Sequence, residues 1–148
     1  MIFSSAPLDR LLGLEVYITS GEGIGGEIKR LVEDFVVEEI SEEGIICSTS
    51  NPPEVAEGSG DYTWFIMMKR GLDSLSAVRK IARYFKISSK RFSLAGLKDA
   101  RALTAQFVCV SGLSPEELLS FKDKRGKVTI MSAFRRPFKL VPGMLYGK

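Results

Sequence analysis

The stretch from residue 91 to residue 110 constrains the fold most, because it sets a charged connection between two strand-like segments. Residues 92–95 are mainly apolar and lead into Gly96, which allows backbone conformations that other residues avoid. Residues 103–110 alternate in the manner of a half-buried β-strand. The chain is therefore expected to make a tight connection between two strands here.

The connection and the strand that follows it carry polar side chains at regular spacing. Lys98 and Asp99 lie in the connection, and Ala102, Thr104 and Gln106 recur at every second position. In a strand that starts near Ala102, these three residues share one face, where a hydroxyl and an amide are available for hydrogen bonds. Taken alone, a Lys-Asp pair in a turn is usually solvated and without a role, so a simple charged turn stays open as an alternative.

The spacing of these residues resembles the signature of a known enzyme family. Residues 96–106, GLKDARALTAQ, match the pattern G-x-K-D-x-x-A-x-T-x-Q of the TruD-type tRNA pseudouridine synthases at every fixed position. In that family the aspartate is the catalytic nucleophile, so the resemblance implies this role for Asp99. It also makes Lys98, Thr104 and Gln106 candidates for substrate binding. Because neighbouring side chains in an extended chain point apart, we expect Lys98 to contact a phosphate or to have a structural role rather than to pair with Asp99.

A second marker of the same family lies earlier in the chain. Residues 34–39, DFVVEE, resemble the family element D-F-x-V-x-E, and Lys29 stands five residues before Asp34 as in the family pattern. The resemblance implies that Lys29 is the cation beside Asp99 or a contact to uracil, and that Phe35 belongs to the substrate site. Without it, Lys29 is expected to be a solvated surface lysine and Phe35 a core residue.

The reaction that the resemblance implies needs neither a metal nor a redox cofactor, so we expect neither, and the composition agrees with this. The chain has no histidine, which excludes a histidine triad, a histidine general base and a histidine-ligated metal. Its two cysteines, Cys47 and Cys109, are far apart and give no metal-ligand spacing, and Cys109 is expected in the core. The net charge of +3 is compatible with an RNA partner. Four cations are candidates for contacts to the RNA backbone: Arg91, Arg101, Arg135 and Arg136.

The segments predict a single domain, residues 1–148, with an α+β fold. We expect a mixed, largely antiparallel sheet of six or seven strands and two helices, forming part of a pseudouridine synthase catalytic fold. Residues 73–86 form the clearer helix, with a cap at Asp73 or Ser74, and residues 114–121 form the second. The apolar stripe of the first helix consists of Leu75, Val78, Ile81, Ala82 and Phe85. Strand character is found at residues 14–19, 27–32, 33–40, 45–48, 62–68, 92–95, 103–110 and 128–133, and loop character at residues 21–26 and 51–60.

The resemblance runs from about Gly25 to the C-terminus and covers only the N-terminal part of a family member. It includes Lys69 and Asp73-Ser74, which resemble the family's K…D-T element with serine in place of threonine. Family members continue with the motif N-x-x-G-x-Q-R-F, whose asparagine and phenylalanine help form the uridine site, and no such motif occurs here. We therefore expect a truncated or divided protein that is inactive alone. Half of the fold leaves a sheet face or edge uncovered, which favours self-association.

Three functions are weighed. The first is the nucleophile-bearing part of a tRNA-modifying isomerase, with tRNA as partner. The second is an RNA-binding module without activity, and the third is an interaction domain unrelated to RNA. No apolar run reaches transmembrane length and no signal peptide is evident, so a cytoplasmic location without a membrane partner is expected.

Overall fold

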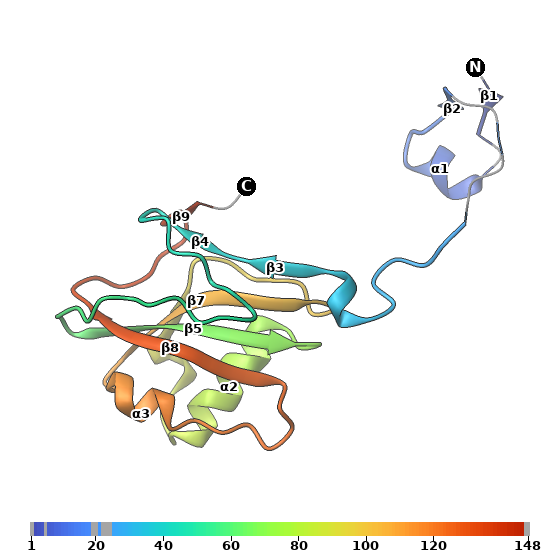
Figure 1. Cartoon of the computed structure of the whole chain (residues 1–148). Helices are drawn as coiled ribbons and strands as arrows, with labels where there is room; N and C mark the ends of the chain where they lie inside the picture. The colour runs from blue at the N-terminus through green and yellow to red at the C-terminus, as the bar shows by residue number, and fades with distance from the viewer. Residues whose placement is uncertain (1, 5, 19–20, 22–24, 147–148) are drawn as a thin grey trace.

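A sheet built on three nine-residue strands forms the centre of the computed structural model, which describes residues 2–4, 6–18, 21 and 25–146 (Figure 1). Strand β7 (Leu103–Ser111) lies next to β5 (Tyr62–Arg70), and β5 lies next to β8 (Val128–Arg136). Both pairings are antiparallel. On its other side β7 pairs in parallel with β3 (Val36–Glu38) near its beginning, and antiparallel with β6 (Phe92–Leu94) near its end. The mixed, largely antiparallel sheet is confirmed.

Two helices cover one face of this sheet (Figure 1). Helix α2 (Ser74–Tyr84) begins at Asp73, whose side chain accepts a hydrogen bond from the Ser76 N–H, and α3 (Pro115–Leu119) begins at the cap Ser114. Their apolar side chains pack on alternate residues of the strands, such as Phe65 and Val108. The expected stripe of α2 is wrong at one position, because Leu75 is 44% exposed.

The opposite face of the sheet is also covered, so β7 is not half-buried as its alternation predicts. Trp64, Phe107 and Cys109 point to this second face and form a cluster with Cys47 and Leu140. Every residue from Thr104 to Val110 is buried as a result. Both cysteines are buried and free, in agreement with the expected core position of Cys109.

Several short elements differ from the expected ones. Residues 27–32 form no strand, and a single 3₁₀ turn, η1 (Val32–Asp34), precedes β3. A second turn, η2 (Ser89–Arg91), precedes β6. Residues 45–48 contribute only an isolated bridge between Ile46 and Ile40, which lies in β4 (Ile40–Ser41). Strand β4 pairs with β9 (Leu145–Tyr146).

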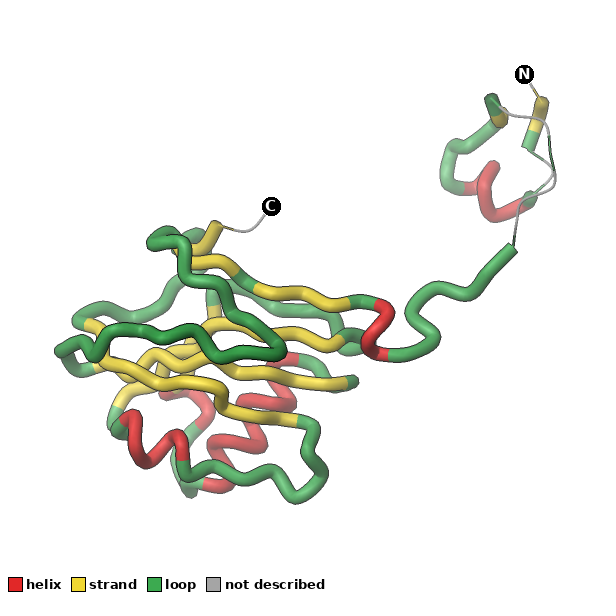
Figure 2. Tube along the Cα trace, in the orientation of Figure 1, coloured by secondary structure: helices red, strands yellow, loops and turns green. Residues whose placement is uncertain are grey.

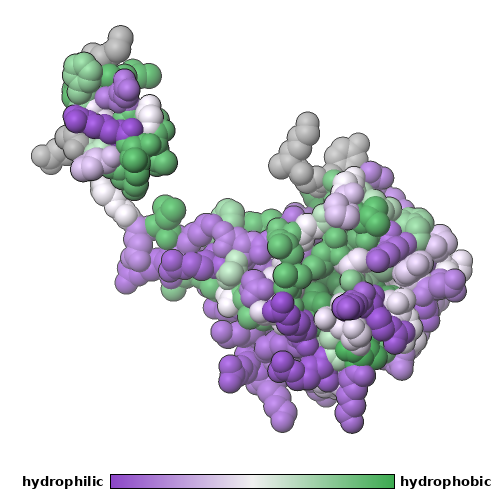
Figure 3. Space-filling view, turned by 180° about the vertical axis from the view of Figure 1, so that it is seen from behind, coloured by the Kyte–Doolittle hydropathy of each residue, from purple (hydrophilic) through white to green (hydrophobic). Residues whose placement is uncertain are grey.

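The first residues form a small unit with a third helix that the sequence pattern did not predict (Figure 2). Strands β1 (Ile2–Phe3) and β2 (Val16–Tyr17) pair around α1 (Pro7–Leu11). The expected strand at residues 14–19 is therefore only two residues long, and residue 19 lies outside the described residues, as do residues 22–24 of the expected loop. Apolar side chains occupy much of this unit's surface (Figure 3), among them Phe3, 76% exposed, and Leu11, 81% exposed.

None of the helices among the described residues is long and apolar enough to cross a membrane.

The turn before β8 is fastened to α2 by one carboxylate. Asp123 lies 2.7 Å from the Lys80 ammonium and accepts hydrogen bonds from the N–H groups of Lys127 and Val128. Burial alone would raise the pKa of Asp123, but the hydrogen bonds from Lys80 and from backbone N–H groups outweigh it, so this pKa lies below its ordinary value.

Replacing this carboxylate is expected to destabilise the domain. Asp123→Ala leaves the Lys80 ammonium and two backbone donors without their acceptor, which should lower the free energy of unfolding by about 2–4 kcal/mol in urea denaturation. Because the pKa is lowered in the folded state, the contribution is present above the unfolded pKa, about 3.9, and is lost as the pH falls through the folded value. The difference between wild type and variant should therefore shrink in acid. A difference that is negligible at pH 7 would contradict this role.

Candidate active site

The loop between β6 and β7, residues 95–102, is anchored to the core of the domain by a series of hydrogen bonds from two buried side chains. The Gln106 amide nitrogen donates to the Gly96 carbonyl at 3.2 Å, and its oxygen accepts from the Ser74 hydroxyl at 2.6 Å. The Ser74 oxygen in turn accepts from the Lys98 N–H at 3.1 Å. Gln106 and Ser74 are both buried, at 0% and 1% exposed. The structure thus places the candidate Gln106 beneath the loop, with its amide engaged within the protein.

Asp99 extends from this loop into solvent contact and meets Lys29, from the other marker. The Lys29 ammonium lies 2.5 Å from Asp99 Oδ2, and the two residues are 70 positions apart in the chain. Asp99 Oδ1 accepts the N–H of Arg101 at 2.8 Å. The Asp99 side chain is 38% exposed. The hydrogen bond from Lys29, followed by that from the Arg101 N–H, lowers the pKa of Asp99 below its ordinary value, so the carboxylate is ionised at neutral pH.

An aromatic ring completes the cationic side of the site. The Lys29 ammonium lies 3.9 Å from the centre of the Phe35 ring, a cation–π contact. Lys29 has a positive φ of 55°, an uncommon conformation for a residue with a side chain. Phe35 is 38% exposed, so it is not a core residue. Lys29, Phe35 and Asp99 are therefore brought together near the beginning of β7, where β3 pairs with it.

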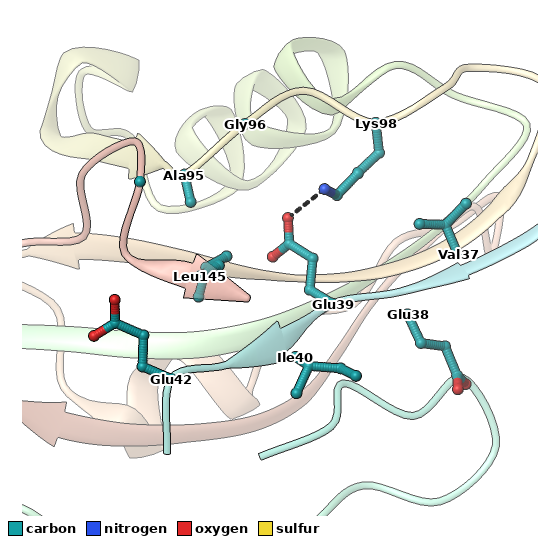
Figure 4. A pocket seen from close by; sticks show the side chains of 10 residues that line it. Val37, Glu38, Glu39, Ile40, Glu42, Ala95, Gly96, Lys98 and Leu145 are labelled. Carbon is teal, nitrogen blue, oxygen red and sulfur yellow. Dashed lines mark ion pairs between the residues drawn. The ribbon is translucent and has the colours of Figure 1, made fainter. Parts of the chain in front are cut away.

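Lys98 points away from Asp99 and toward β3. Its ammonium forms an ion pair with Glu39 Oε1 at 2.9 Å, drawn in Figure 4, and Glu39 Oε2 accepts the Phe107 N–H at 2.8 Å. Burial raises the pKa of Glu39, opposed by Lys98 and the Phe107 N–H. The pair lies in a cleft of about 920 Å³ between residues 37–42, the loop and Leu145. Sequence analysis did not single out Glu39, although it is the last fixed residue of the D-F-x-V-x-E element.

Thr104 and the four candidate arginines are not part of the group formed by Lys29, Phe35 and Asp99, and they lie at different distances from it. Thr104 is fully buried opposite Lys69, and its hydroxyl has no hydrogen-bond partner among the described residues. Arg101 lies within the loop and is exposed. The other three arginines lie at the far end of the central strands: Arg135 pairs with Thr63, Arg136 forms an ion pair with Glu43, and Arg91 lies against Gly112. The seven positions from Tyr62 to Lys69 put that end about 20 Å from the loop.

Comparison with known proteins decides the family. The family model described as tRNA pseudouridine synthase D (TruD) matches residues 11–148. The chain belongs to the TruD family. It is 36% identical over 133 residues to a probable tRNA pseudouridine synthase D of Archaeoglobus fulgidus, covering 90% of this chain and 30% of that protein. It is 38% identical over 136 residues to the tRNA pseudouridine synthase D of Geobacter metallireducens, covering 91% of this chain and 30% of that protein.

A solved TruD structure has the same arrangement. The crystal structure of a candidate tRNA pseudouridine synthase D from Methanosarcina mazei superposes with a TM-score of 0.72 and 26% identity, covering 97% of this chain and 30% of that one. The chain therefore spans about a third of the length of its TruD relatives.

Removing the cation beside the carboxylate should be visible in the titration of Asp99. Because Lys29 lowers the pKa of Asp99, Lys29→Met is expected to make the Asp99 carboxyl protonate at higher pH, and the acid limb of any activity that needs the carboxylate would move to higher pH. The ¹³Cγ chemical shift of Asp99 followed against pH measures this. Arg101→Met is the matched control, because Arg101 binds Asp99 through its backbone N–H, which the substitution keeps. An unchanged titration in Lys29→Met would exclude the ion pair in solution.

Proposed function

We propose that this chain forms the nucleophile-bearing part of an enzyme that isomerises uridine to pseudouridine in tRNA. One observation carries the proposal: an ionised carboxylate, Asp99, stands on a loop anchored in the core and meets Lys29 from a distant segment. Both residues occupy fixed positions of the TruD pattern. The TruD relatives are named for this reaction, which supports extending it to the protein that contains these residues.

The reaction breaks the N1–C1′ bond of uridine, turns the uracil and rejoins it through C5, which loses a proton while N1 gains one. A carboxylate suits this work because it attacks carbon when ionised, at C1′ of the sugar or at C6 of the ring. Lys29 lowers the pKa of Asp99 further and would approach a uracil oxygen beside the carboxylate. The exposed face of Phe35 offers a surface for a base that has left the RNA stack.

Phosphate contacts would bring tRNA to the site. Arg101 is placed to meet the backbone next to the reacting nucleotide, whereas Arg91, Arg135 and Arg136 would meet a more distant part of the RNA. A tRNA substrate also agrees with the proposed cytoplasmic location. Apolar side chains at the outer side of β3 and β4, such as Val36 at 47% exposed, suit self-association of the isolated chain.

The salt dependence of binding tests the RNA partner apart from catalysis. If about four phosphates are contacted, raising salt from about 50 to 200 mM should weaken tRNA binding by on the order of 100-fold. Arg101→Ala should reduce the slope of log affinity against log salt by about 1. Fluorescence anisotropy with labelled tRNA measures both. A flat salt response, or the absence of binding, would favour an interaction domain unrelated to RNA.

An RNA-binding module without activity is the second candidate. This second function is favoured by the exposure of the site. Asp99 and Phe35 are each 38% exposed, and none of the described residues encloses a flipped base. The two candidates differ in one result. A polypeptide that carries these residues together with the remainder of a TruD protein forms pseudouridine only under the first.

A further inference from the structure

Lys69 is a fully buried lysine whose ammonium contacts backbone oxygens. It lies at 0% exposure near the end of β5, opposite Thr104 of β7 and Val128 of β8. Within the described part of the chain, Lys69 forms no ion pair. Its ammonium donates instead to two backbone oxygens, Asp99 O at 2.7 Å and Lys98 O at 3.4 Å.

Burying the ammonium group of Lys69 costs free energy, because the charge loses its hydration. Burial lowers the pKa of Lys69 below its ordinary value, and the charges of Asp73 and Asp99 offset only part of this effect. A methionine of similar length would pack at this position without the desolvation of a charge. The two contacts of the ammonium therefore need an explanation beyond packing, and both are made to the peptide groups that carry the candidate nucleophile.

The contacts of Lys69 complement those of the other side chains around the loop. Gln106 and Ser74 fix the loop before Asp99, at the Gly96 carbonyl and the Lys98 N–H. Lys29 binds the carboxylate itself. Only Lys69, among the described side chains, holds the main chain of Asp99, and this sets the direction in which its Cα–Cβ bond leaves the loop.

We propose that Lys69 is a positioning residue for the reaction, which aims the Asp99 carboxylate by binding its backbone and places a buried ammonium group next to the peptide that carries it. The inference rests on the proposed role of Asp99 as nucleophile. Lys69 itself touches neither the base nor the sugar. Its effect on a substrate passes entirely through Asp99.

The first test needs no activity. In the 148-residue chain, Lys69→Met should raise the pKa of Asp99, followed by its ¹³Cγ shift, and speed amide exchange of the Arg101 N–H by on the order of tenfold. Lys69→Gln keeps a donor without the charge, so it should restore part of the exchange protection and none of the pKa effect. Lys80→Met is the matched control. It removes a lysine that pairs with Asp123, away from the loop, and should change neither readout at Asp99.

The second test uses a full-length TruD protein that contains these residues. Lys69→Met should lower kcat by on the order of 100-fold while KM stays close to wild type, because misplacement of the nucleophile by about 1 Å affects the transition state and not substrate binding. The acid limb of the pH profile of kcat for Lys69→Met should move to higher pH. Lys80→Met should keep the wild-type profile.

The outcomes separate this inference from the proposed function. Normal Asp99 titration and normal Arg101 exchange in Lys69→Met, or in Lys69→Gln where the first variant does not fold, would overturn the positioning role. Shifts in both, with no pseudouridine formed by the wild-type full-length protein, would refute the proposed function and leave the clamp on Asp99 intact. A loss of stability with unchanged kcat and pH profile would show that Lys69 serves folding alone.

Discussion

Purified alone, the 148-residue chain is expected to form no pseudouridine in tRNA. In the proposed reaction Asp99 is the nucleophile, but the uridine must also be held out of the stack and oriented beside it. In the described residues Asp99 and Phe35 form one side of the site and are each 38% exposed. The motif that the resemblance implies for the other side of the uridine site does not occur in these 148 residues. Because a misplacement of about 1 Å can cost on the order of 100-fold in rate, a missing wall should remove detectable turnover.

Carbodiimide labelling followed by mass analysis detects the product, since pseudouridine keeps the mass of uridine until it is labelled. The Geobacter metallireducens relative, named as a tRNA pseudouridine synthase D, is the positive control. Product from the 148 residues that is lost in Asp99→Ala would show that a second copy supplies the missing wall, or that it is dispensable. Sedimentation of the same sample distinguishes these two cases.

The main elements of the sheet were predictable because each is long enough to show its own periodicity. The strand at residues 62–68 and the helix at residues 73–86 appear as β5 and α2 with nearly the expected bounds. Helix α1 has five residues, too few for an apolar stripe to be recognised. Burial of β7 on both faces depends on distant residues such as Cys47 and Leu140, which its own alternation cannot reveal.

The sequence indicated which residues form the candidate site, but it did not indicate all of the contacts that they make. The two family markers bring Lys29 and Asp99 into one hypothesis, and the structure places them 2.5 Å apart. The partner of Lys98 could not be foreseen, because its contact with Glu39 depends on the parallel pairing of β3 with β7. In the same way, the hydrogen bond that Gln106 accepts from the Ser74 hydroxyl depends on the packing of α2 on β7 and not on spacing in the sequence.

Asp99→Asn in a full-length TruD protein that contains these residues is expected to abolish pseudouridine formation and spare tRNA binding. The asparagine side chain is nearly the same size, and its oxygen can still accept the Arg101 N–H, so the loop should keep its shape. A neutral amide, however, cannot attack carbon as a carboxylate does. Removing a nucleophile in this way should lower the rate by on the order of 10⁴-fold or more.

The control for this variant is Asp61→Asn, which makes the same chemical change at an exposed position just before β5, at the end of the sheet away from Asp99. Its rate and its tRNA affinity should equal those of the wild type. Any general effect of losing one negative charge on RNA binding would appear in both variants.

The most direct test of the central claim is the single-turnover rate of pseudouridine formation by the full-length protein, compared among wild type, Asp99→Asn and Asp61→Asn at saturating enzyme. With enzyme in excess, the rate reports the chemical step and not product release. We predict product from wild type and Asp61→Asn at equal rates and none from Asp99→Asn, with tRNA bound equally by all three. Product formed by Asp99→Asn at the wild-type rate would show that Asp99 is not the nucleophile.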